Sequence, residues 1–320
     1  MRNLSRVHRV LFTAAAILLS GCHQGMASSN QSQAAPILTD QFETVFYAKV
    51  DLLSGYGGYK RLSPRDANAL RAPFAGLLYA LEPLGKQVST EVLRNSDAAL
   101  VGAKDFRAPG GPPPNLGAVQ SSFCYILVLG NRSTFDISKV ASKSGVMSSA
   151  ENAVWKWSAP PTEGHSQPYT FYATQVAHSY LLISNSLDDV RAISPKLGSN
   201  TAPNLSGFRD WESISQHDLW GYRRYRHNEV HDKEAAGTTF VTSTATALSF
   251  FADADKKTVV LRLFASDGST AEKINARKEL PLLKSVGEGS WEATIPLSGD
   301  EASVERVLIA MWLFGFGIYL

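Results

Sequence analysis

The chain has 320 residues, of which 44% are hydrophobic and 19% are charged, and its formal net charge is +2. This composition is typical of a globular protein with a sizeable core and excludes a largely disordered chain. A nearly neutral chain has no overall electrostatic attraction for nucleic acid, so we expect no nucleic-acid partner. The loop at residues 55–60 lacks the phosphate-binding pattern, and the sequence predicts no cofactor.

Residues 1–21 have the three parts of an export signal. Three arginines and no acidic residue stand in this stretch, and the apolar run Val10–Leu19 is interrupted only by Thr13. The run is too short to span a bilayer, which needs about 20 apolar residues. Loss of the three arginines with the signal would leave 28 basic against 29 acidic residues, so the mature chain is predicted to be almost neutral.

The stretch Leu19-Ser20-Gly21-Cys22 follows the apolar run and resembles the lipobox of bacterial lipoproteins. The resemblance covers only the first 22 residues. It implies that the signal is cut before Cys22 and that Cys22 carries fatty acyl chains, so that membrane lipid is a partner. Two or three acyl chains hold a protein on a membrane stably, whereas one chain does so marginally. The alternative is an ordinary cleaved signal followed by an unrelated cysteine.

The resemblance also implies a place in the cell. A lipid-anchored chain would lie in the cell envelope. Position 23 is His23 and not the aspartate that tends to keep such lipoproteins at the inner membrane. The resemblance therefore implies an outer-membrane protein that faces the periplasm, if the cell is Gram-negative.

The rest of the chain is predicted to comprise a tether and two α+β halves. Residues 22–41 are the predicted flexible tether, because residues 23–36 carry no charge and few large apolar side chains. Residues 42–200 form the predicted first half and residues 201–320 the second. The boundary lies in a stretch rich in glycine, asparagine and proline near residues 198–205.

The first half opens with alternating strand and helix patterns. Ser63 and Pro64 predict a helix start, and Pro73 predicts a break in that helix. The other expected elements are a strand at Phe42–Leu53, a short helix at Val88–Leu93, a strand at Ala98–Ala103 and a hairpin formed by Tyr169–Ala177 and Tyr180–Ile183.

Cys124 lies in the apolar strand pattern of residues 122–129. If Cys22 is acylated, Cys124 has no partner for a disulfide, because the chain has two cysteines. We expect a buried, unreactive thiol, since no basic residue stands near it to stabilise a thiolate.

An offset of 136 residues relates the two halves. It carries Trp155 onto Trp291, each in a short strand pattern. It also carries Ser133, with Asp136 three residues on, onto Ser269 and Glu272, so that both halves are predicted to begin a helix with a capping box after a strand. We therefore predict two similar α+β halves, each an antiparallel sheet covered by helices. Their closing helices are expected at about Leu187–Leu197 and Asp300–Leu313.

The second half contains the predicted ligand-binding face. A strand is expected at Leu219–Arg226, after a short helix at Phe208–Ile214. Alternate side chains of a strand share one face, which here joins aromatic rings to arginines. Such a face suits an anionic ligand or an envelope protein, because guanidinium groups bind anions and stack on rings. Its residues are Trp220, Tyr222, Arg224 and Arg226. The plainer alternative is an exposed strand whose arginines pair with nearby acids.

A candidate metal site follows the strand directly. Two histidines four residues apart could share a helix face and bind a divalent metal together with carboxylates. The candidate ligands are His227, Glu229, His231 and Asp232. The spacing departs from the metalloprotease pattern, and the surrounding sequence is typical of a loop, so a solvated loop without metal is the favoured interpretation.

No catalytic motif stands out in the sequence. We therefore predict a membrane-anchored envelope lipoprotein with a non-enzymatic binding or structural role. The alternative is an envelope hydrolase or a metal-dependent enzyme that uses the region His217–Asp232. The apolar residues 307–320 leave three explanations open: burial in the core, docking of a partner, or a chain that continued beyond Leu320.

Overall fold

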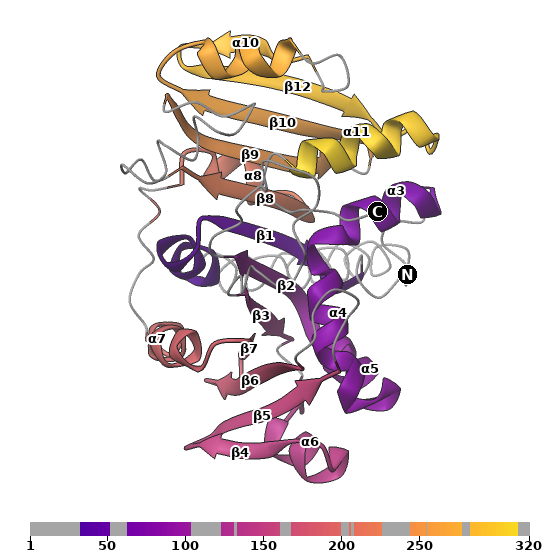
Figure 1. Cartoon of the computed structure of the whole chain (residues 1–320), viewed down its shortest axis with the longest axis vertical. Coiled ribbons are helices and arrows are strands. Elements are labelled where there is room, and N and C mark those ends of the chain that lie inside the picture. The colour runs from indigo at the N-terminus through magenta and orange to yellow at the C-terminus, as the bar shows by residue number, and fades with distance from the viewer. Residues whose placement is uncertain are drawn as a thin grey trace, which may run out of the picture.

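The computed structural model describes residues 33–51, 63–103, 123–130, 133–160, 168–199, 205, 208–225, 244–253, 255–276 and 282–312. Within these residues the predicted α+β fold is confirmed. One antiparallel sheet of twelve strands carries helices on both of its faces (Figure 1).

The strands follow one another from one end of the molecule to the other in the order β11-β12-β10-β9-β8-β1-β2-β3-β7-β6-β5-β4. In Figure 1 they run from β12 near the top to β4 at the bottom. Their bounds are β1 Thr44–Lys49, β2 Ser96–Ala103, β3 Phe123–Leu129, β4 Ser148–Glu151, β5 Val154–Ala159, β6 Tyr169–Val176, β7 Tyr180–Ser184, β8 Leu219–Arg224, β9 Ala245–Asp253, β10 Thr258–Ala265, β11 Lys284–Gly287 and β12 Ser290–Pro296.

The helices agree closely with the expected positions. Residues 33–41 are also helical. The other bounds are α3 Pro64–Arg71, α4 Ala75–Leu81, α5 Lys86–Arg94, α6 Ile137–Ser144, α7 Leu187–Leu197, α8 Trp211–Ile214, α10 Ser269–Asn275 and α11 Glu301–Trp312, with 3-10 turns η1 Ala72–Phe74 and η2 Glu82–Leu84.

The sheet is continuous across the predicted boundary between the halves. Strand β1 pairs with β2 on one side and with β8 on the other, and both pairings are antiparallel. Each half therefore contributes one partner to β1, so the two halves share a single sheet.

Local sequence explains the helix boundaries at α3 and α4. The Ser63 hydroxyl accepts the backbone N–H of Asp66, 3.1 Å away, and donates to the Asp66 carboxylate at 2.9 Å. This cap confirms the predicted helix start. Pro73 falls in the 3-10 turn between α3 and α4, which confirms the predicted break.

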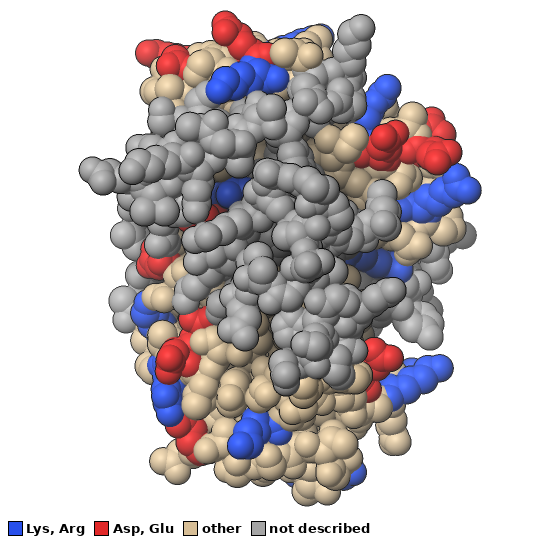
Figure 2. Space-filling view, viewed as in Figure 1, with Lys and Arg blue, Asp and Glu red and all other residues tan. Residues whose placement is uncertain are grey.

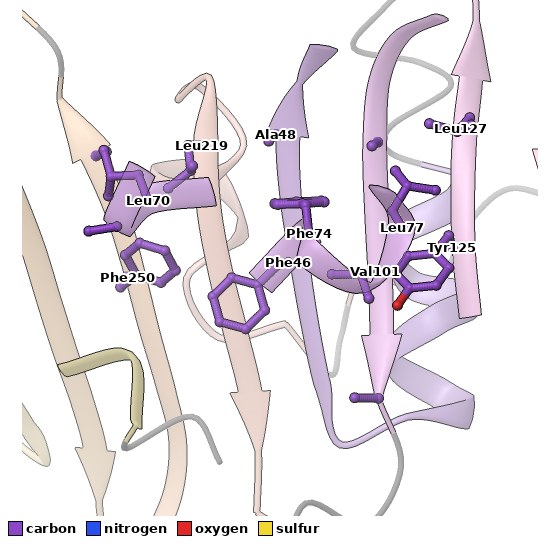
Figure 3. Packing of buried hydrophobic residues seen from close by; sticks show 14 of the residues in the cluster. Phe46, Ala48, Leu70, Phe74, Leu77, Val101, Tyr125, Leu127, Leu219 and Phe250 are labelled. Carbon is purple, nitrogen blue, oxygen red and sulfur yellow. The ribbon is translucent and has the colours of Figure 1, made fainter. Parts of the chain in front are cut away.

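One face of the sheet packs against α3, α4, α5, α6, α10 and α11. Figure 3 shows part of this core, where Phe46 of β1 and Phe250 of β9 lie beside each other and Leu77 of α4 lies near Tyr125 of β3. The rings of Phe46 and Phe250 are 5.4 Å apart between centroids. Gly221 of β8 leaves room for them, since a Cβ there would lie 2.4 Å from Phe250 and 2.6 Å from Phe46.

The opposite face packs against helix 33–41, α7 and α8. Ala34, Ala35 and Leu38 of the first helix are completely buried, so these residues are part of the folded body. The prediction of a flexible tether up to residue 41 is therefore wrong for residues 33–41. Their apolar side chains recur at helical spacing, and the amide of Gln33 donates to the carbonyl of Ser199 at 2.6 Å.

The predicted similarity of the halves is clearest in two hairpins. In the β4–β5 hairpin, Ser148 faces Lys156, Ser149 faces Trp155 and Glu151 faces Val154. In the β11–β12 hairpin, residues 284, 285 and 287 face residues 292, 291 and 290. All six positions differ by 136, and both registers skip one residue at the same place. The turns correspond too, because Ala153 (φ 55°) and Gly289 (φ 63°) are both left-handed.

The halves differ in what lies between the hairpin and the preceding strand. In the second half β12 pairs directly with β10, whereas in the first half β7 and β6 lie between β3 and β5. The first half therefore has an additional hairpin, β6–β7, whose turn uses the left-handed residues Ala177 and His178.

The predicted capping boxes at Ser133 and Ser269 are wrong. Helix α6 begins at Ile137, and its cap is Asp136, which accepts the backbone N–H of Ser138 at 2.9 Å. In the second half Asp267 accepts the backbone N–H of Ser269 at 2.9 Å. An aspartate two residues before a serine is the feature that the two helix starts share, because a carboxylate is the stronger acceptor.

The end of the described chain belongs to the core. Val307, Leu308 and Ala310 of α11 are buried, which agrees with the first of the three explanations for residues 307–320. Residues 313–320 lie outside the described residues. Among the described helices, none combines the length and the apolar character that crossing a membrane requires.

Candidate functional site

The predicted ligand-binding face is mostly buried. Trp220 and Tyr222 do share one face of β8, but their exposed fractions are 0% and 1%. Arg224 is exposed at the end of the strand, and Arg226 lies outside the described residues. The prediction of an open aromatic and arginine face is therefore wrong for its aromatic members.

Aromatic side chains from other elements cover this face. Tyr47 of β1 stacks on Trp220 at 5.4 Å between ring centroids, and Trp211 of α8 meets Trp220 edge-on at 5.8 Å. Phe208 lies 4.3 Å from Tyr222, again between centroids. These contacts supply apolar packing in a central strand whose two faces are both covered.

The other predicted site residues are not placed by the structure. Cys22 and the metal candidates His227, Glu229, His231 and Asp232 all lie outside the described residues. Within the described ranges no three of the side chains His, Cys, Asp and Glu come together as a metal site would require. Cys124 is described, and it is buried in β3 as a free thiol, in agreement with the sequence.

A polar cluster on the same face of the sheet centres on Arg262 of β10. Arg262 Nη1 donates to Asp210 Oδ1 at 2.9 Å and to the Ser213 hydroxyl at 2.7 Å. Arg262 Nε donates to Glu292 Oε2 at 2.8 Å. The hydroxyl of Ser249, directly opposite Arg262 on β9, donates to Asp210 Oδ2 at 2.6 Å. We call these five residues the Arg262 cluster.

The cluster attaches a loop to the sheet. Asp210 and Ser213 belong to the segment around α8, whereas the other three residues belong to neighbouring strands. Burial opposes the charge of Arg262, but the hydrogen bonds to Glu292 and Asp210 outweigh it and raise the pKa of the guanidinium. One cation therefore holds two carboxylates, and the side chain of Asp210 is only 10% exposed.

His217 lies beside the cluster, in the turn between α8 and β8. Its imidazole stacks on Phe251, with 4.0 Å between the ring centroids and 12° between the planes. Burial lowers the pKa of His217, with a further contribution from the nearby positive charges of Lys256 and Arg262. Asp253 and Asp218 act in the opposite direction. The net effect favours a neutral imidazole at pH 7.

The sequence analysis identified His217 but missed the Arg262 cluster. One signal was available, because Arg262 interrupts the apolar strand pattern of β10 and a charge in such a strand requires a partner. The partners themselves come from four separate segments, and no local pattern indicates them. Chemically, the cluster is a set of donors and acceptors that satisfy one another, an arrangement that fixes a loop in place.

Comparisons with known proteins add the following. No family model matches the chain, and no curated protein matches it. Two crystal forms of a protein named TP0453, forms I and III, are similar in structure, with TM-scores of 0.40 and 0.41 and 10% sequence identity. The matches cover 86% and 84% of this chain and 94% of TP0453 in both cases. No functional conclusion follows from a similarity of this size.

Proposed function

We propose that the protein is a lipid-anchored lipoprotein of the bacterial cell envelope, whose folded body has a non-enzymatic binding or structural role. The observation that carries the proposal is the sequence Leu19-Ser20-Gly21-Cys22 directly after the apolar run Val10–Leu19. A thiol at this place is a suitable nucleophile for attachment of a lipid, and small neighbours give a peptidase access to the backbone. Outer-membrane attachment on the periplasmic side is part of the proposal for a Gram-negative cell.

The position of the first described helix supports this arrangement. The body begins at Gln33, whose amide is bound to the carbonyl of Ser199, 2.6 Å away, just after α7. Eleven residues then separate Cys22 from Gln33, which is enough chain to reach about 36–40 Å when fully extended. An anchored Cys22 would thus leave the body free to contact other envelope components.

The Arg262 cluster supports the non-enzymatic role of the body. Asp210, Glu292 and Ser213 already bind Arg262, and Ser249 already donates to Asp210. A general base or a nucleophile needs a lone pair that faces a substrate. In this cluster the lone pairs of Asp210 and the donors of Arg262 instead serve to hold the α8 segment on the sheet.

The anchor can be tested through the two cysteines. In cells fed a fatty-acid probe, the wild-type chain should become labelled and should sediment with membranes. Cys22→Ser should abolish the label and release the protein into the soluble envelope fraction. Persistent labelling of Cys22→Ser would contradict the proposed attachment site.

Cys124→Ala is the matched control, because it removes the other thiol of the chain. Cys124 is fully buried in β3, so this variant should keep both the label and the membrane association. Its free energy of unfolding should fall by about 1 kcal/mol, since a small apolar group is lost from the core. Loss of the label in Cys124→Ala would show that labelling depends on something other than Cys22.

A further inference from the structure

The sheet ends in two similar edge hairpins, one at each end of the molecule. Strand β11 pairs only with β12, and β4 pairs only with β5, so each has one side facing away from the sheet. Four large hydrophobic side chains of the described residues are exposed, and three of them border these hairpins: Val146, Leu282 and Val286. Val146 and Leu282 differ by 136 positions and so occupy corresponding places.

The edge strand β11 is the more open of the two. All four of its residues are exposed, and the exposed fraction of Val286 is 58%. The register with β12 skips Val286, so this residue has no Cα partner on β12. An exposed strand with an apolar residue at its centre can pair with another strand.

The sequence around Val286 is complementary to itself. It reads Lys284-Ser285-Val286-Gly287-Glu288, and all five residues are exposed. If two copies of this stretch lie antiparallel with Val286 facing Val286, each Lys284 faces a Glu288 of the other copy. Opposite charges and matched apolar residues across two strands both stabilise a pairing.

We propose that two copies of this chain associate through β11, with the two strands antiparallel about a twofold axis at Val286. The contact places one Val286 on the other and forms two Lys284–Glu288 ion pairs, so the same surface serves both copies. The sheets of the two copies become one continuous sheet.

The other edge lacks this complementarity. The positions in β4 that correspond to Lys284, Val286 and Glu288 hold Ser148, Ala150 and Asn152. The backbone register and the skipped residue are the same in both hairpins. The side chains therefore favour pairing at β11, and β4 is a natural control for the backbone geometry.

A contact of about five residues is smaller than the interface of a stable dimer, which buries roughly 1,200–2,000 Å². The association should therefore be weak in dilute solution, and covalent trapping is the suitable measurement. Facing Cα atoms in an antiparallel pair lie about 4.5–5.5 Å apart, a distance that a disulfide can bridge. Val286→Cys should thus form a disulfide-linked dimer under mild oxidation.

The experiment compares Val286→Cys with Ala150→Cys in the full-length chain, with the wild type as baseline for any reaction of the natural cysteines. We expect a dimer band on a non-reducing gel for Val286→Cys and only the baseline for Ala150→Cys. Equal yields for the two variants, or no dimer from Val286→Cys, would overturn the proposal.

A charge exchange tests the two ion pairs. Adding Lys284→Glu to Val286→Cys places like charges opposite each other and should reduce the dimer yield by roughly threefold to tenfold. Adding Glu288→Lys as well exchanges the two charges and should restore the yield. A yield that stays unchanged after the first substitution, or low after the second, would show that the strands do not pair in this register.

Discussion

Trp155 of β5 and Trp291 of β12 occupy the same place in two hairpins that share one register. Trp155 faces Ser149 and Trp291 faces Ser285, and in both hairpins the next residue of the edge strand is skipped. Both tryptophans are partly buried against the same core cluster. Corresponding positions in the two hairpins can therefore be compared within one protein, where solvent, temperature and chain length are identical.

The turns of the two hairpins predict opposite effects of opposite substitutions. Ala153 and Gly289 both have a positive φ, which costs a residue with a Cβ about 1–2 kcal/mol. Gly289→Ala should destabilise the protein by at least this amount, because the new Cβ would also lie 2.7 Å from the carbonyl oxygen of Ala265. Ala153→Gly should be neutral or stabilising, since relief of the strained φ offsets the added freedom of the unfolded chain.

Urea unfolding followed by circular dichroism measures both effects as changes in the transition midpoint. The two variants change a single methyl group each, in opposite directions, at corresponding positions. A midpoint lowered equally by both would contradict the structural equivalence of the two turns.

Much of the fold follows from local sequence patterns. The helix start at Ser63, the break at Pro73 and the hairpin turn near His178 were all predicted, because caps, prolines and turn residues act within a few positions of themselves. The correspondence of Trp155 and Trp291 was likewise predicted from the offset of 136 residues. Its physical basis is that an equal spacing of strand and turn residues produces an equal register.

The parts that sequence did not predict depend on distant contacts. Alternation placed Trp220 and Tyr222 correctly on one face of β8, but it could not show that Phe208, Trp211 and helix 33–41 cover that face. The same helix lacks charge and resembled a tether, and only its contact with the sheet reveals its role. The Arg262 cluster is non-local in the same way, since Arg262 and Asp210 are 52 residues apart.

Loss of Arg262 should destabilise the protein through the carboxylates that it leaves behind. Arg262→Leu would leave Asp210 and Glu292 without their cation on a face where Asp210 is largely buried. We expect the free energy of unfolding to fall by roughly 1–3 kcal/mol, between the values for exposed and for buried ion pairs. The midpoint of urea unfolding measures this loss.

Arg191 provides the matched control for Arg262. Arg191 also binds two carboxylates, those of Glu151 and Asp188, but its side chain is 54% exposed. Water can replace those partners, so Arg191→Leu should shift the midpoint far less than Arg262→Leu. Equal shifts would mean that burial does not determine the contribution of the Arg262 cluster.

The glycine of β8 is required by the aromatic rings beside it. A Cβ at Gly221 would lie 2.4 Å from Phe250 and 2.6 Å from Phe46, closer than atoms can approach. Gly221→Ala should therefore cost roughly 1–3 kcal/mol of stability through overpacking. Gly287→Ala in β11 is the control, because no atom lies within 4 Å of its Cβ position. Thermal unfolding of the two variants should separate them by several degrees.

His217 should make stability depend on pH in the mildly acidic range. Burial lowers the pKa of His217 below the ordinary value of 6.5, so below pH 6.5 the unfolded chain takes up a proton more readily than the folded protein. The stability that neutral His217 contributes is therefore present above pH 6.5 and is lost as the pH falls through the lowered pKa of the folded state.

Two variants separate titration from stacking on Phe251. Neither His217→Phe nor His217→Gln can titrate, so in both the melting temperature should fall less steeply than in the wild type as the pH is lowered from 7.5 to about 5, a window that spans the ordinary histidine pKa. His217→Phe keeps an aromatic ring on Phe251 and should be the more stable of the two at pH 7.5. A wild-type slope in both variants would assign the pH dependence to other groups. A flatter slope in His217→Gln alone would mean that the phenylalanine ring repacks the α8 segment, which a changed near-ultraviolet circular dichroism spectrum would reveal.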